Sequence, residues 1–150
     1  MAERLVVLLS EPCQLDDAMV EVRASIGVAL APRGAGMSYT GGYLPATDST
    51  ITLDMTRMNR VLRISPDDMT VTVEAGCTWL ALNEALAPHG LRTPFWGPMS
   101  GIYSTIGGGL SNLNAMFGAG HHGTSSESVI ALTMVLGDGQ LLQGHGQAAG

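Results

Sequence analysis

The sequence predicts a mixed fold of the α+β (α/β) class, and three observations support this prediction. Two apolar runs flank a helix-like repeat near the start of the chain, a strictly alternating segment follows, and 20 glycines indicate many tight turns. The 150 residues are 45 % hydrophobic and only 13 % charged. That length is enough for a domain with a buried core.

The N-terminal segment predicts a strand–helix–strand unit. Residues 5–9 are continuously apolar, and residues 14–25 carry apolar side chains at three- and four-residue steps. This spacing is typical of an amphipathic helix, which we expect to stop at Gly27. Residues 28–31 form the next apolar run. Such a unit usually pairs its two strands in parallel, so we expect two buried parallel strands here.

The middle of the chain predicts a hairpin followed by a capped helix. Residues 61–64 and 70–74 alternate in polarity on either side of the turn-forming residues 65–68. Thr78 is placed to cap a helix that contains Trp79, Leu82, Ala85 and Leu86 and that ends at residues 88–90.

Three more segments complete the expected elements. Residues 51–54 and 128–136 predict strands, and the second should form a hairpin with residues 140–142 across Gly137-Asp138-Gly139. Residues 144–150 have no core-forming side chain and are expected to be frayed. A change of composition near residues 55–59 predicts a boundary between subdomains.

Charge and cysteine content exclude several classes of protein. The net charge is −6 and no basic run exists, which argues against a nucleic-acid-binding protein but not against one bound dinucleotide. Cys13 and Cys77 show no metal or redox spacing, so we expect two buried thiols in a reducing compartment. The first residues are too short and acidic for a signal peptide, and no run reaches transmembrane length. These features predict a cytoplasmic protein.

The strongest candidate site is a glycine-rich loop that Arg33 opens. Four glycines and one serine occur in residues 34–42, between two strand-like runs. Glycine allows positive φ and a close approach to the main chain, so this loop is suited to expose backbone N–H groups to an anion such as phosphate. A surface turn without a ligand is the alternative interpretation.

A second glycine-rich segment spans residues 98–112 and surrounds a triple glycine with hydroxyl side chains. Its amides and hydroxyls would suit a pyrophosphate or a ring carbonyl. The alternative is a helix start that packs tightly against a neighbour through its glycines. Both can be true, because a helix N-terminus is itself an anion site.

Other motifs are weaker. The G-x-G-x-x-G match at residues 118–123 does not follow a predicted strand, so we do not interpret it as a dinucleotide fingerprint. The side chains of His121 and His122 should diverge, and a loop or ring-stacking role is favoured over metal binding. Glu74 could accept a hydrogen bond from a ligand or cap a turn. No nucleophile with a base is visible, which excludes the common hydrolases.

In this order, the segments resemble the FAD-binding domain of the vanillyl-alcohol oxidase family, also called the p-cresol methylhydroxylase (PCMH) type. The closest branch is that of glycolate oxidase and D-lactate dehydrogenase. The resemblance covers nearly the whole chain, and it rests on these segments: 28–38, 53–61, 70–76, 82–91, 104–108, 123–129 and 135–139. It implies a PCMH-type fold with a first subdomain over residues 1–56, an incomplete second one over 57–143 and a tail over 144–150.

The resemblance also implies FAD as the cofactor and assigns the residues that bind it. The pyrophosphate loop would comprise Arg33, Gly34, Ala35, Gly36, Met37 and Ser38, closed by Gly41 and Gly42. A second wall would comprise Pro98, Ser104, Thr105, Gly107 and Gly108. The ring system or ribityl chain would lie near Ser111, Asn112, His122 and Gly123, and Val129 would contact the adenine or ribose. No metal ligand is assigned.

Two departures from the family pattern qualify this assignment. Some relatives attach flavin covalently through a histidine at the position of Met37, so FAD should be non-covalent here. The family also continues beyond Leu142 into further flavin-domain strands and a substrate domain, so the catalytic residues are unassigned.

Two functions therefore remain open. One is the FAD-binding part of an oxidoreductase that oxidises a 2-hydroxy acid or related alcohol. The other is a non-catalytic flavin-binding fragment or a subunit completed by another chain. The cell-wall enolpyruvyl reductase, which has a related fold, is a weaker third possibility.

Overall fold

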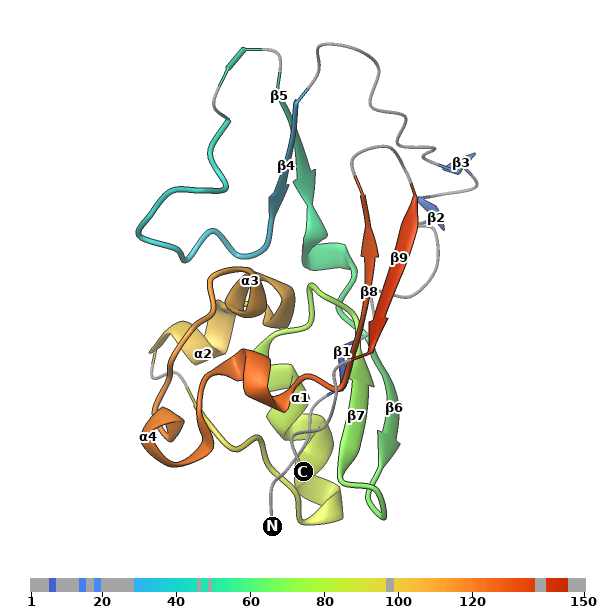
Figure 1. The fold of residues 1–150 in the computed structure, drawn as a ribbon, viewed down its shortest axis with the longest axis vertical. Coiled ribbons are helices and arrows are strands. Elements are labelled where there is room, and N and C mark those ends of the chain that lie inside the picture. Colours follow the sequence, from blue (N-terminus) through green and yellow to red (C-terminus); the bar gives the residue numbers. More distant parts are fainter. Residues whose placement is uncertain are drawn as a thin grey trace.

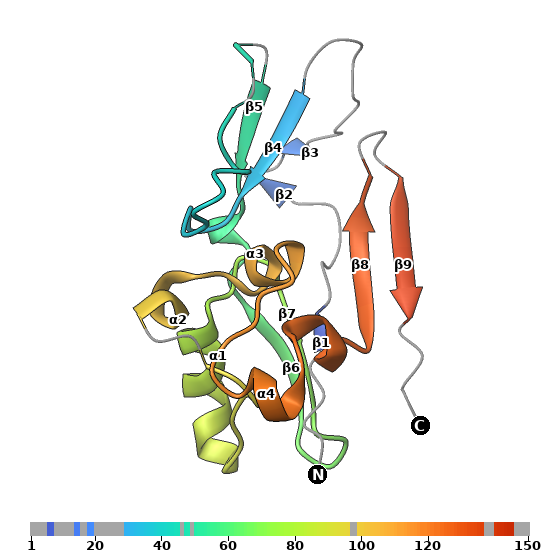
Figure 2. The same cartoon turned by 60° about the vertical axis from the view of Figure 1, so that its left-hand side comes forward.

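The computed structural model describes residues 6–7, 14–15, 18–19, 29–45, 47–48, 50–96, 99–136 and 140–145. Figure 1 shows the paired strands β4 (Ala29–Arg33) and β5 (Thr50–Asp54) and the loop between them at one end of the molecule. A larger part, made of a hairpin and helices, lies at the other end. The turned view in Figure 2 keeps the same arrangement, with helix α3 (Ile106–Ser111) facing the loop. Helices and strands are thus mixed, as the sequence predicts.

The predicted central hairpin is confirmed. Strands β6 (Val61–Ser65) and β7 (Thr70–Val73) pair in antiparallel fashion, with a register shift between Val61 and Arg63. The alternation decides which face is buried, because Val71 and Val73 enter the core while Thr70 and Thr72 stay half-buried. Strand β1 (Val6–Val7) adds to β7 in parallel and gives a three-stranded sheet of order β1-β7-β6.

The predicted capped helix is also confirmed. Helix α1 (Trp79–Leu86) begins after Thr78, whose Oγ1 accepts the Ala81 N–H at 3.1 Å. It continues into the 3-10 turn η2 (Ala87–His89) and ends at Gly90, which has a φ of 68°. Trp79, Leu82 and Leu86 point into the core and recur at the three- and four-residue steps of a helix face.

One hydrophobic core lies in the larger part of the molecule. It joins apolar side chains of β7, the turn after it, α1 and the segments that follow: Val71, Val73, Cys77, Trp79, Leu82, Leu86, Phe95 and Ile106. Trp79 and Phe95 meet edge to face, with ring centroids 5.4 Å apart. The start of helix α3 (Ile106–Ser111) is anchored here, because Ile106 is fully buried.

The parallel pair differs from the one predicted. Strand β4 (Ala29–Arg33) pairs in parallel with β5 (Thr50–Asp54), not with the first strand, and the glycine-rich loop connects them instead of a helix. Its described residues are exposed or half-buried, so the expectation of a buried strand is wrong. Strand β5 confirms the predicted strand over residues 51–54. The 3-10 turn η1 (Met55–Arg57) follows it and leads to β6.

The helix predicted over residues 14–25 is also wrong where the structure describes that segment. Residues 14–15 and 18–19 form two short antiparallel strands, β2 (Gln14–Leu15) and β3 (Ala18–Met19). Asp16 and Asp17 separate these strands in the sequence, and aspartate favours turns over helix interiors. The remaining residues of that prediction, with Gly27 and Val28, lie outside the described residues.

The last hairpin is shorter at one end and longer at the other than expected. Strand β8 (Ala131–Val135) pairs with β9 (Leu141–His145), whereas Ser128 belongs to the 3-10 turn η3 (Ser125–Ser128). Gly144 and His145 pair with Leu132 and Ala131, so the predicted fraying does not begin at residue 144. The predicted turn at residues 137–139 and residues 146–150 lie outside the described part.

Candidate functional site

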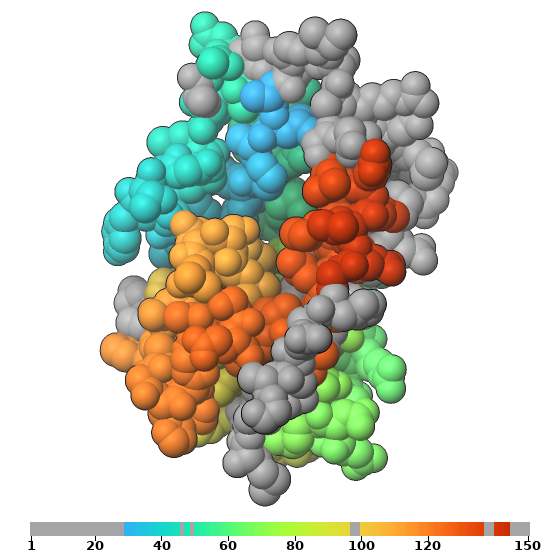
Figure 3. Space-filling view, viewed as in Figure 1, coloured from blue at the N-terminus to red at the C-terminus, as the bar shows by residue number. Residues whose placement is uncertain are grey.

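The structure brings the two glycine-rich segments together. A Cβ placed on Gly34 would collide with the hydroxyl of Thr105, so the loop backbone touches the residue that precedes α3. Ser38 Oγ donates to Asn112 Oδ1 over 3.4 Å at the other end of that helix. Figure 3 shows the loop (cyan) directly above the surface of α2 (Met99–Tyr103) and α3 (orange). Segments about seventy residues apart in sequence thus form one site.

The loop after β4 offers free backbone donors. Among the described residues, four successive N–H groups have no acceptor: those of Ala35, Gly36, Met37 and Ser38. The next backbone hydrogen bonds along the chain form the turn in which the loop folds back. Gly41 N–H donates to Ser38 O at 3.4 Å, and Leu44 N–H donates to Gly41 O at 2.8 Å. Gly36 has a φ of 69°, the left-handed conformation that an amide nest requires. The local geometry therefore suits an anion.

Arg33 adds a positive charge to this nest. A Cβ on Gly36 would lie 3.0 Å from Arg33 Nη2 and 3.1 Å from Nε, so the guanidinium lies against the bare Cα of Gly36. Arg33 forms no ion pair with any residue that the structure describes. Its register partner Asp54 is instead bonded to Thr56, at 2.6 Å from the hydroxyl and 2.9 Å from the N–H. These bonds lower the pKa of Asp54, with a smaller contribution from the charge of Arg33.

The second segment has already used its backbone donors. The N–H groups of Ile106 and Gly107 donate to Cys77 O and Ala75 O, each at 2.8 Å. The N–H of Gly108 donates to Thr105 Oγ1 at 3.3 Å, which is the N-cap bond of α3. These three amides are thus bonded within the protein, as a tightly packed helix start requires. The assignment of this segment to the cofactor site stays a prediction.

Two polar side chains of α3 are also engaged within the helix. Ser111 Oγ donates to Gly107 O at 2.8 Å, and Asn112 Nδ2 donates to Gly108 O at 2.9 Å. Both residues remain exposed, so a ligand on this surface can reach them. Ser104 is half-buried and its carbonyl accepts the Trp79 N–H at 3.3 Å, while Pro98 lies outside the described residues.

Glu74 has a structural role. Its buried carboxylate accepts from Arg60 through Nε at 2.9 Å, through Nη2 at 2.6 Å and through the backbone N–H at 2.8 Å. These bonds outweigh the opposing effect of burial and lower the pKa of Glu74. The pair fixes the turn of residues 74–77, onto which the start of α3 docks. Of the two roles considered, the structure shows the turn-stabilising one.

The predicted residues of the C-terminal third lie apart from the loop. His122 belongs to the four-residue helix α4 (Ala119–His122), which Figures 1 and 2 place on the far side of α3 from the loop. The rings of His121 and His122 do not diverge as expected but meet edge to face, with centroids 4.5 Å apart. Gly123 follows with a φ of 77° beside the Glu127 carboxylate, and Val129 is half-buried before β8.

The G-x-G-x-x-G match is not a dinucleotide fingerprint. Gly118 and Gly123 flank α4, and the residue before the motif, Phe117, forms only an isolated bridge with Trp96. Phe117 is 69 % exposed, while Trp96 is half-buried.

Sequence reasoning missed three polar or aromatic groups. Tyr43 places its ring against the Arg33 guanidinium, with 5.6 Å between Cζ and the ring centroid. Asn114 Oδ1 and Ser125 Oγ are buried without a hydrogen-bond partner among the described residues. No sequence pattern marks these residues, because their neighbours come from other turns of the chain.

Cys77 is a buried free thiol, as predicted, and burial raises its pKa to about 11, with a smaller effect of the Glu74 charge. Cys13 lies outside the described residues. Within the described ranges, no three His, Cys, Asp or Glu side chains come together as metal ligands would. Nor does any helix there have the length and apolar character needed to cross a membrane.

Comparison with known proteins shows the family of this chain. The family model "FAD binding domain" matches residues 4–144. D-lactate dehydrogenase [cytochrome] 1, mitochondrial, from Saccharomyces cerevisiae is 35 % identical over 116 residues, which cover 76 % of this chain and 19 % of that protein. Glycolate oxidase subunit GlcD from Bacillus subtilis is 32 % identical over 122 residues, covering 81 % and 26 % respectively. The chain thus spans about a fifth to a quarter of these relatives.

Solved structures show the same fold. An alkyldihydroxyacetonephosphate synthase superposes with a TM-score of 0.74 over 97 % of this chain and 26 % of that one, at 23 % identity. Chitooligosaccharide oxidase gives a TM-score of 0.66 over 96 % of this chain and 31 % of that one, also at 23 % identity. The predicted fold class is therefore confirmed.

Proposed function

Because this chain belongs to the FAD binding domain family, we propose that residues 33–38 hold the diphosphate of FAD, with Gly41 and Gly42 closing the loop. The observation that supports this assignment is the set of N–H groups of Ala35 to Ser38, which have no acceptor in the described part of the chain and lie beside the Arg33 guanidinium. Backbone donors in a left-handed nest and one cation are what a diphosphate requires. The residues present therefore fit the cofactor.

The second segment then forms the opposite wall. Thr105 contacts Gly34, and Asn112 is bonded to Ser38. These two contacts set the distance between the second segment and the loop. We assign this wall a packing role, because its N–H groups are bonded within the protein. The assignments of Ser104, Gly107, Gly108, Ser111, His122, Gly123 and Val129 to FAD, and of Pro98, stay predictions.

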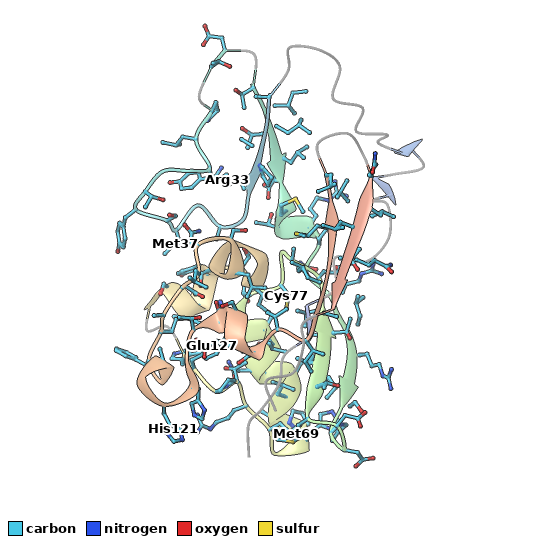
Figure 4. All side chains as sticks on the ribbon, in the orientation of Figure 1. Arg33, Met37, Met69, Cys77, His121 and Glu127 are labelled. Carbon is cyan, nitrogen blue, oxygen red and sulfur yellow. The ribbon has the colours of Figure 1, made fainter. Side chains whose placement is uncertain are left out.

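We propose that FAD is held without a covalent bond. Met37 stands where some relatives carry the linking histidine, and a thioether cannot form that bond. Figure 4 shows Met37 at the edge of the loop next to α3, whereas His121 lies at the opposite end of the helical part of the molecule. This position of His121 supports the proposal of non-covalent binding.

When bound, FAD would supply the acceptor for a hydride or electrons, while the protein binds and orients it. The relatives support an oxidoreductase that acts on a 2-hydroxy acid or related alcohol, since D-lactate and glycolate appear in their names. L-gulonolactone oxidase from Mus musculus is also similar, at 32 % identity over 127 residues. The candidate substrates of this chain's whole protein therefore extend to the class of lactone in that name. The subdomain division near residue 56 and a cytoplasmic location remain proposals.

A visible absorbance spectrum tests the assignment. The purified chain is incubated with FAD, desalted and then precipitated with acid. We expect a flavin band that survives desalting and moves to the supernatant after acid treatment. Flavin that stays in the pellet would contradict non-covalent binding, and no retained flavin in a folded chain would contradict the proposal itself.

The variant Gly36→Val tests the loop. A side chain at Gly36 is strained at a φ of 69° and displaces Arg33, so flavin retention should be lost in a protein that remains folded. Gly120→Ala is the matched control, because a Cβ there meets nothing within 4 Å. Unchanged flavin affinity in Gly36→Val would refute the loop assignment.

A further inference from the structure

We propose that Tyr43 is a positioning residue for the diphosphate site, and that it acts only through Arg33. This inference rests on the proposed FAD site. The Arg33 guanidinium lies over the Tyr43 ring at 5.6 Å, within the range of a cation–π contact. The same guanidinium lies about 3 Å from where a Gly36 Cβ would be. Tyr43 thus holds the cation against the nest.

The course of the loop explains how Tyr43 reaches Arg33. The turn bonds from Gly41 N–H to Ser38 O and from Leu44 N–H to Gly41 O fold the chain back, and Gly41 permits this with a φ of 66°. The return brings the ring, ten residues later in sequence, beside the end of β4. Half-burial of Tyr43 agrees with this contact, whereas Tyr39 of the same loop is fully exposed.

Among the described residues, Asp54 acts on the Arg33 side chain only through a weak charge–charge effect. The carboxylate of Asp54, the register partner of Arg33, is bonded to Thr56. Arg33 has no ion pair among the described residues, so its orientation depends on the ring. A long side chain without such a contact loses more conformational freedom when it binds an anion, and Tyr43 removes part of that cost in advance.

The ring matters through its face and not through its hydroxyl. In the part of the chain that the structure describes, the Tyr43 hydroxyl has no hydrogen-bond partner. Phenylalanine should therefore preserve the effect, while leucine keeps apolar bulk and removes the negative ring face. This difference separates a cation–π role from simple packing.

The test measures dissociation constants of FAD and of ADP, which carries the diphosphate without flavin, for the folded chain and its variants. Tyr43→Leu should weaken both ligands by the same factor, about threefold, and Tyr43→Phe should bind like the unchanged protein. Tyr39→Leu is the matched control in the same loop and should have no effect. Arg33→Leu should weaken both ligands by about tenfold or more.

The double variant decides the mechanism. In an Arg33→Leu background, Tyr43→Leu should cause no further loss, because its effect passes through the guanidinium. A further threefold loss in that background, or equal losses in Tyr43→Phe and Tyr43→Leu, would overturn the inference. Unchanged binding in Tyr43→Leu would also overturn it while leaving the FAD site intact. Absence of FAD and ADP binding in the unchanged protein would overturn the proposed function, and this inference with it.

Discussion

The two glycine-rich segments look alike in sequence but serve different purposes in the structure. The loop of residues 34–42 leaves four successive N–H groups without acceptors among the residues that the structure describes, and it bends at Gly36 and Gly41 through positive φ. The start of α3 bonds its first N–H groups to Ala75, Cys77 and the Thr105 hydroxyl. Its glycines serve close packing, since a Cβ on Gly107 would lie 2.7 Å from that of Ala75.

This difference shows that hydrogen-bond accounting, not glycine content, identifies an anion site. Backbone donors that a protein leaves unpaired at its surface are available to a ligand, whereas donors inside the packed part must be satisfied. Under the proposed function, the second segment therefore limits how closely the protein approaches the loop, and the first segment binds the diphosphate. Three predictions can break or sharpen this comparison.

Equivalent substitutions in the two segments should have opposite consequences. Gly107→Ala overpacks the contact with Ala75 and should lower the free energy of unfolding by about 1–3 kcal/mol. Gly34→Ala collides with Thr105, but the exposed loop can move, so we expect little change in stability and weaker FAD binding. Urea unfolding of the FAD-free proteins and FAD titration distinguish the two, with Gly120→Ala as the control. A loss of stability in Gly34→Ala as large as in Gly107→Ala would contradict the comparison.

The turn that receives α3 should be sensitive to acid. The folded-state pKa of Glu74 lies below its ordinary value of 4.5, because Arg60 bonds to the carboxylate. The stabilisation is therefore complete above the unfolded-state pKa and is lost as the pH falls through the folded-state pKa. Glu74→Gln should lower stability at pH 7 by about 1–3 kcal/mol and flatten the profile between neutral and acidic pH.

Denaturant unfolding at a series of pH values checks this expectation. Asp67→Asn, in the exposed turn between β6 and β7, is the control for loss of a carboxylate and should leave the stability at pH 7 unchanged. If Glu74→Gln retains the full slope of the unchanged protein, another carboxylate is responsible for it.

The smallest effects concern two threonine caps that lie side by side. Thr78 and Thr105 form an isolated bridge, and each hydroxyl caps a helix, at 3.1 Å to Ala81 N and 3.3 Å to Gly108 N. Replacing either by alanine should cost about 1 kcal/mol of stability. Only Thr105→Ala should also change FAD affinity, because only Thr105 touches the loop. Equal FAD affinities in the two variants would show that the Gly34 contact has no role in binding.

Local patterns predicted the elements whose stabilising contacts are close in sequence. The β6–β7 hairpin and the Thr78-capped helix follow from alternation, turn chemistry and a cap three residues from its partner. The helix prediction over residues 14–25 is wrong at residues 14–15 and 18–19, the part that the structure describes, because apolar periodicity alone does not weigh two adjacent aspartates in the sequence. The β4–β5 pairing was missed because a strand of five residues does not specify its partner.

The sequence by itself determined the glycine loop, the arginine that opens it and the resemblance that implies FAD, because these depend on residue type and order. Only the tertiary structure decided which of two similar segments keeps its donors free, that Glu74 bonds to Arg60, and that Tyr43 meets Arg33. Each of these outcomes depends on a partner from another turn or strand. A backbone donor has the same chemistry wherever it lies, and only the fold decides whether a carbonyl is within reach.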